Sequence, residues 1–194
     1  MASRPQRWGW IGALLWLLSM QPSAACTLWG AAGSAVHGGG TLVAKNRDGV
    51  PDHRQELVVL KPPQGYRTLA LRAVGGAEPG FKAGVNEKGL VIVSATASQV
   101  PAGQRRAVQP KKEWMRHFLA NCASVDELLP ALERLNRPVF YLAGDRHEIA
   151  LIEVTPAGRR SVHRQGSGTL HHTNHYCAVE APDLKRKPGA SSRQ

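Results

Sequence analysis

Cys26 is the residue with the clearest chemical potential, because it follows a stretch typical of a secretory leader. Residues 1–25 contain a positively charged start, an apolar run at 11–20 and small residues at 23–25. Cleavage after position 25 gives Cys26 a free α-amine beside its thiol. Unperturbed pKa values of about 8.5 for a thiol and about 7.7–8.0 for an α-amine let the amine take the thiol proton near neutral pH. One residue then supplies both nucleophile and base, as covalent chemistry on amides requires.

Two other interpretations of Cys26 stay open. An exported chain with a cysteine after small residues can be a lipoprotein with an acylated thiol, although that signal usually has a large aliphatic residue where Ser23 stands. Cys26 can also be structural, since thiol reactivity depends on the environment. The chain has three cysteines, and in an oxidising compartment an odd count leaves one thiol free or intermolecular. A disulfide between Cys122 and Cys177 would leave Cys26 free.

Asp48 and Asn174 are the other candidates for catalysis. Residues 27–36 and 41–46 are predicted to form a hairpin around a glycine-rich turn, and antiparallel pairing brings Asp48 back beside Cys26. A carboxylate there can orient the amine or the thiol; the alternative is an ordinary turn aspartate. Asn174 ends the last predicted strand, where its side-chain N–H can stabilise an oxyanion; the alternative is an ordinary loop asparagine.

The elements that must position these residues form an α+β layered domain, with strands on both sides of a helical region. Ser124 begins the second helix with a capping box that includes Glu127, and Pro130 should kink it. Further strands are predicted at 57–61, 67–74, 81–86, 90–96, 139–143, 148–154, 159–164 and 169–172, and helices at 111–121 and from 124 onward.

The composition suits one exported domain. Of 194 residues, 42% are hydrophobic, which excludes intrinsic disorder, and we divide the chain into a signal peptide (1–25), a domain (26–182) and a polar basic tail (183–194). The leader's apolar run is much shorter than the roughly 20 residues of a membrane span, so we expect a secreted or periplasmic protein without a membrane span; an uncleaved N-terminal anchor is the alternative.

Several partner classes are not expected. The formal net charge is +11, but the basic residues are scattered and do not alternate with aromatic residues as in a nucleic-acid platform. His171 and His175 lie in an extended segment, and the sequence has neither HExxH nor paired CxxC, so we expect no metal. The phosphate-loop and dinucleotide patterns are missing, which predicts no cofactor, and without GxSxG the usual serine esterase is excluded.

Four segments, taken in order, resemble a known family. They are residues 26–29 (CTLW), 46–48 (NRD), 84–90 (GVNEKGL) and 173–175 (TNH). Together they resemble the N-terminal-nucleophile (Ntn) hydrolases of the acyl-CoA:6-aminopenicillanic-acid acyltransferase group, which is related to the choloylglycine hydrolases and penicillin V acylases. The resemblance implies a four-layer αββα sandwich.

The resemblance also implies a reaction: cleavage or transfer of an acyl group at a linear amide of a small N-acyl compound, through a thioester. Cys26 would be the nucleophile, Asp48 would orient the N-terminus, and Asn174 would stand on the oxyanion side. Lys45 stands where choloylglycine hydrolases carry an arginine, and Thr96 where they carry an oxyanion asparagine. Both are therefore candidate substrate or oxyanion contacts.

One departure from the family concerns length. The chain ends 20 residues after Asn174, whereas family members continue with further strands and helices. We therefore expect a sandwich that is incomplete at its C-terminus. The alternatives to an active enzyme are an inactive fragment of one and a lipid-anchored or soluble exported domain without chemistry. The oligomeric state is not predicted.

Overall fold

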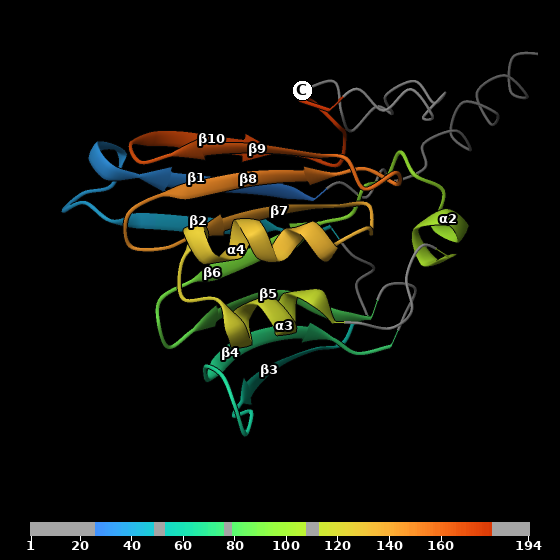
Figure 1. Cartoon of the computed structure of the whole chain (residues 1–194), viewed down its shortest axis with the longest axis horizontal. Coiled ribbons are helices and arrows are strands. Elements are labelled where there is room, and N and C mark those ends of the chain that lie inside the picture. The colour runs from blue at the N-terminus through green and yellow to red at the C-terminus, as the bar shows by residue number, and fades with distance from the viewer. Residues whose placement is uncertain (1–25, 49–52, 76–78, 108–112, 180–194) are drawn as a thin grey trace, which may run out of the picture.

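Two antiparallel sheets form the framework of the protein (Figure 1). The structure is a computed structural model that describes residues 26–48, 53–75, 79–107 and 113–179, so the predicted leader and basic tail lie outside the described residues. The smaller sheet has the strand order β10-β1-β2, and the larger has the order β3-β4-β5-β6-β7-β8-β9. Among the described residues, no helix is long and apolar enough to cross a membrane.

The elements follow the order strands, helices, strands that the sequence predicts. They are β1 (Thr27–Ala32), η1 (Gly33–Ala35), β2 (Thr41–Asn46), β3 (Gln55–Leu60), β4 (Thr68–Ala73), β5 (Gly80–Asn86), β6 (Val91–Ala95), α2 (Ala102–Ala107), α3 (Trp114–Asn121), α4 (Val125–Ala131), η2 (Leu132–Arg134), β7 (Val139–Gly144), β8 (Ile149–Val154), β9 (Arg160–Gln165) and β10 (Gly168–His172).

The described residues form three layers of the expected sandwich: helices, large sheet and small sheet. Helices α3 and α4 pack on one face of the large sheet, around a core that includes Phe118 and Tyr141 (Figure 1). The small sheet packs on the other face, around a second core that includes Leu28 and Phe140. Apolar residues on both faces of the large sheet explain this arrangement, since each face must be covered. A second helical layer is not among the described residues.

The two sheets approach each other closely at Gly30. A Cβ atom at Gly30 would lie 3.2 Å from side-chain atoms of both Leu142 and Ile149. The missing side chain therefore lets β1 lie directly against β7 and β8. This contact fixes the depth at which β1, and so Cys26 just before it, sits between the sheets.

Most predicted strands are confirmed, and the differences have local causes. The first strand ends at Ala32 instead of position 36, because Gly33 has a φ of +58° and starts the turn η1. Pro130 lies inside α4, which ends at the next residue and tightens into η2. Helix α2 was not predicted. The disulfide between Cys122 and Cys177, which the sequence left open, is not formed: both residues are free thiols.

Asn86, in the GVNEKGL segment, ties the end of β5 to the end of α3. Its side-chain Nδ2 donates to the carbonyls of Leu119 and Cys122, both at the C-terminus of the helix, at 2.8 and 2.7 Å. Its Oδ1 accepts hydrogen bonds from the backbone nitrogens of Lys88 and Leu90, each at 3.1 Å. Asn86 is buried, so its amide replaces water for four backbone groups at once.

Replacing Asn86 with alanine should lower the free energy of unfolding by about 2–4 kcal/mol, because several buried backbone groups lose their partners. Urea denaturation measures the change. Asn121→Ala is the control, because this exposed side chain bonds only within α3 as far as its described contacts show, and it should change the free energy by less than about 0.5 kcal/mol. Equal effects of the two changes would contradict this role of Asn86.

Candidate active site

One cavity of about 530 Å³ lies at the end of the two sheets where β1 begins and β2, β6 and β10 end. All five residues singled out from the sequence line it: Cys26, Lys45, Asp48, Thr96 and Asn174. They come from segments far apart in the chain. The structure therefore brings the whole predicted set into one site.

The backbone nitrogen of Cys26 is held by the Asn174 side chain. Cys26 N donates to Asn174 Oδ1 at 2.5 Å, and Asn174 Nδ2 donates to the carbonyl oxygen of Thr96 at 2.7 Å. Asn174 is only 2% exposed, so these bonds fix the orientation of its amide. We expected the side-chain N–H of Asn174 to face an oxyanion; here that N–H is bonded to Thr96 and the oxygen faces Cys26. Thr96 contributes its backbone carbonyl to this arrangement.

The strand register explains why Cys26 faces the cavity. Leu28 lies opposite both Lys45 in β2 and His172 in β10, and its side chain is fully buried between the sheets. Cys26 is two residues earlier, and residues two apart in a strand share a face. Thr27 pairs with Asn46, which confirms that the end of β2 returns beside Cys26. Asp48 follows at this end, where its carboxylate accepts a hydrogen bond from Asn46 Nδ2 at 3.2 Å.

Lys45 crosses from the small sheet to the large one. Its Nζ donates to the backbone carbonyl of Ser94 in β6. Burial lowers the pKa of Lys45 to about 8; the nearby Cys26 raises this pKa, whereas Lys82 and Arg47 lower it further. The Lys45 side chain is therefore mostly protonated at neutral pH, and it lines the same cavity as the Cys26 thiol.

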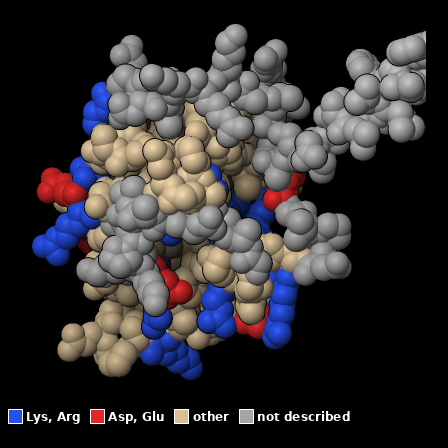
Figure 2. Space-filling model, turned by 90° about the vertical axis from the view of Figure 1, so that its right-hand side faces the viewer, with Lys and Arg blue, Asp and Glu red and all other residues tan. Residues whose placement is uncertain are grey.

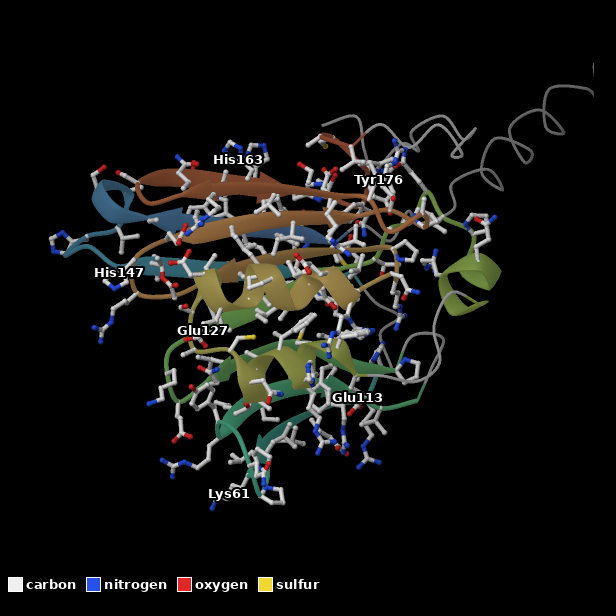
Figure 3. The ribbon with its side chains drawn as sticks, in the orientation of Figure 1. Lys61, Glu113, Glu127, His147, His163 and Tyr176 are labelled. Carbon is white, nitrogen blue, oxygen red and sulfur yellow. The ribbon has the colours of Figure 1, made fainter. Side chains whose placement is uncertain are left out.

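Positive charge dominates the cavity lining. Figure 2 faces this side of the molecule and shows Lys and Arg atoms inside the hollow. Glu113, which also lines the cavity, lies at the start of α3 (Figure 3). The described charged residues of the lining are Lys45, Arg47, Lys82, Arg105 and Arg137 on the basic side and Asp48 and Glu113 on the acidic side. A charged lining of this kind attracts anions into the cavity.

An apolar hollow of about 330 Å³ adjoins the cavity along β2. Lys45 and Arg47 line both, so the two spaces share one wall. The rest of the hollow is aliphatic, because strands β3–β6 extend beyond the small sheet and leave side chains such as Leu57 exposed. Its aliphatic lining consists of Val43, Leu57, Leu69, Ala70, Leu71, Ala83, Val85, Val91 and Val93.

The sequence analysis missed Glu153 and His172. Both are nearly inaccessible, and His172 Nε2 lies 2.8 Å from Glu153 Oε1. Potential ligand atoms of Glu153, His172 and Cys177 lie within 4.8 Å of one another. The sequence contained one indication of this pair: a glutamate within an otherwise apolar strand (IALIEV). An acidic residue is rarely fully buried without a partner, so this glutamate predicts a buried partner.

These features define an Ntn-hydrolase fold, and the comparisons agree. The chain belongs to the acyl-coenzyme A:6-aminopenicillanic acid acyl-transferase family, whose profile matches residues 36–194. A sequence comparison with curated proteins gave no match.

Two solved structures are similar in fold. A mutant of conjugated bile acid hydrolase from Clostridium perfringens has a TM-score of 0.55 at 18% identity, over 75% of this chain and 52% of that chain. An N-acylethanolamine-hydrolyzing acid amidase ortholog from Caenorhabditis elegans has a TM-score of 0.57 at 17% identity, over 78% of this chain and 71% of that chain. The present chain thus spans about half the length of the first protein.

The low pKa of Lys45 predicts that Lys45→Met stabilises the protein at pH 7, by about 1–3 kcal/mol, because the fold no longer buries an ammonium. The pKa is about 8 in the folded state against 10.5 for an ordinary lysine, so the unfolded chain binds more protons between these pH values. The free energy of unfolding of the parent therefore rises from pH 8 to 10.5. The stability advantage of Lys45→Met over the parent should become smaller over the same range.

Urea denaturation at pH 7 and pH 10 measures this difference. The matched control is Lys61→Met, which removes an exposed ammonium and should change the free energy of unfolding at pH 7 by less than about 0.5 kcal/mol. If the difference in free energy of unfolding between Lys45→Met and the parent is the same at both pH values, burial does not lower the pKa of Lys45.

Proposed function

We propose that the protein is an exported cysteine Ntn amidohydrolase or acyltransferase that cleaves the linear amide of a small N-acyl compound. The observation that carries the proposal is the hydrogen bond from the Cys26 nitrogen to Asn174, beside the cavity that Cys26 lines. In the processed chain that nitrogen becomes the α-amine. Membership of the family, whose profile matches residues 36–194, supports amide chemistry for the protein as a whole.

In the proposed reaction, the α-amine of Cys26 takes the proton of its own thiol, and the thiolate attacks the amide carbonyl carbon. The C–N bond then breaks, the amine leaves with the proton from the α-ammonium, and the acyl group remains as a thioester. Water or a second amine attacks the thioester carbonyl and loses its proton to the α-amine. The C–S bond then breaks and releases the acyl product, and the Cys26 thiolate takes the proton back from the α-ammonium. Each step moves one proton through the nitrogen of Cys26.

The surrounding residues have distinct proposed roles. The side-chain oxygen of Asn174 accepts a hydrogen bond from the α-amine of Cys26 and so directs the lone pair of that amine. The Lys45 ammonium supplies positive charge for the thiolate and for the oxyanion that forms during attack, where a fixed charge is most effective. Asp48 stands at the same end of β2 and orients the processed terminus. Thr96 holds Asn174 through its carbonyl.

The lining of the cavity and of the adjoining hollow favours a substrate with one anionic group and one apolar group. The basic lining of the cavity favours a compound with a carboxylate or another anionic group, whereas the adjoining apolar hollow favours an apolar acyl chain. Lys45 and Arg47 form the shared wall, and in the proposed complex the reacting amide lies beside this wall. We therefore propose N-acyl amino acids and related acidic N-acyl compounds as the first substrates to examine.

Replacing Cys26 with alanine should lower kcat by more than about 1,000-fold while the protein stays folded, because nucleophile and proton acceptor work as one unit. Cys26→Ser should also lose most activity, since a hydroxyl is a weaker nucleophile near neutral pH. Turnover of a panel of acidic N-acyl compounds measures the effect. Cys177→Ala is the control and should keep activity within about 3-fold.

Intact mass of the secreted protein completes this experiment. A chain that begins with an unmodified Cys26 agrees with the proposal. A diacylglyceryl adduct on Cys26 would instead support a lipid-anchored domain, and full activity of Cys26→Ala would exclude Cys26 as the nucleophile. A folded, correctly processed chain that turns over none of the panel would favour an inactive domain.

A further inference from the structure

The buried carboxylate of Glu153 gathers the segment that carries Asn174. Glu153 lies in β8 and is 2% exposed. Its carboxylate accepts hydrogen bonds from the backbone nitrogens of Cys177, Ala178 and Val179 at 2.8, 3.1 and 3.0 Å. Three consecutive backbone N–H groups therefore point at one side chain. This arrangement fixes the chain a few residues after Asn174.

His172 fixes the same segment on its other side. Its Nε2 lies 2.8 Å from Glu153 Oε1, and its Nδ1 lies 2.7 Å from the carbonyl oxygen of Thr173. The carbonyl can only accept a hydrogen bond, and so can an ionised carboxylate. Burial opposes ionisation of Glu153, but the hydrogen bonds from His172 and from the backbone of Cys177 and Ala178 outweigh it, so its pKa lies below the usual value.

Both ring nitrogens of His172 therefore face hydrogen-bond acceptors, one on the backbone and one on the buried carboxylate. The Phe140 ring packs on the imidazole with a centroid distance of 4.4 Å and excludes water from it. The cluster of Glu153 and His172 therefore holds the backbone on both sides of Asn174.

Asn174 lies between these two anchors. His172 fixes the chain two residues before it, and Glu153 fixes the chain from three residues after it. Tyr176 adds a third attachment, since its hydroxyl donates to the Val154 carbonyl at 2.7 Å at the same end of the molecule (Figure 3). The Asn174 amide can thus reach both Cys26 and Thr96 only while this segment keeps its path across the end of β8.

We propose that Glu153, acting through His172 and the backbone of residues 173–179, is a positioning residue for the Cys26 nitrogen. This inference rests on the proposed function, in which that nitrogen is the base. Glu153 does not line the cavity and therefore acts through Asn174. The described hydrogen bonds of Glu153 go to His172 and to the backbone just after Asn174, so its principal effect is on the geometry of this segment.

The first test compares Glu153→Gln with the control Glu148→Gln. Glu148 lies just before β8, and its carboxylate forms an ion pair with Arg164 at the surface. Glu153→Gln should lower kcat by about 10- to 100-fold and leave KM within about 3-fold, because substrate contacts are unchanged. Glu148→Gln should leave both constants within about 2-fold. Glu153→Asp, which keeps the charge, should recover part of the lost kcat.

A double-variant cycle separates positioning from a general loss of structure. If Glu153 acts through Asn174, adding Glu153→Gln to Asn174→Ala should lower kcat by less than about 2-fold further. A multiplicative loss in the double variant would overturn the proposal. So would a change in KM that is as large as the change in kcat.

Two readouts do not depend on turnover. Nitrogen-15 NMR of the parent protein should show both ring nitrogens of His172 in hydrogen bonds, and a ring with an unbonded nitrogen would overturn the proposal even if no variant folds. In Glu153→Gln, alkylation of Cys26 by iodoacetamide should require higher pH than in the parent, and an unchanged pH profile would also overturn it. Because these tests need no substrate, they remain informative if Cys26→Ala stays active and the proposed function fails.

Discussion

The buried amide of Asn174 joins the two sheets at the end where β1 begins. Through Oδ1 it holds the nitrogen of Cys26 in the small sheet, and through Nδ2 it holds Thr96 just after β6 in the large sheet. Because Asn174 is almost fully buried, water cannot replace either bond when the sheets separate slightly. The geometry of the candidate site therefore depends on the packing of the whole sandwich, including the close contact at Gly30.

Charge is the second constraint on this site. Lys45 in β2 and Arg47 just after it line the cavity, and Lys82 adds a third cation from β5. Burial lowers the pKa of Lys45 most, the nearby Cys26 raises it, and Lys82 and Arg47 lower it further. The apolar hollow shares the wall formed by Lys45 and Arg47, so a basic cavity and an aliphatic surface lie side by side.

The sequence predicted the hairpin well, and the site only in part. Alternating residues and glycine turns determine the pairing of β1 with β2, and pairing alone brings the end of β2 beside Cys26. The partner of the Cys26 nitrogen could not be derived in this way, because Asn174 is 148 residues away and its loop is placed by tertiary contacts. Glu153 was overlooked for a related reason: its neighbours read as a plain apolar strand, and its partners become visible only after β8 and β10 pack together.

The most direct test of this account is to trap the acyl group during turnover of an N-acyl substrate. The reaction is quenched with acid, and the protein is digested and mapped by mass spectrometry. The account predicts that the mass of the acyl group appears on the first peptide of the mature chain, at Cys26, as a thioester that hydroxylamine removes. An acyl group on another residue, or a mature chain that turns over substrate while its N-terminal amine is blocked, would contradict it.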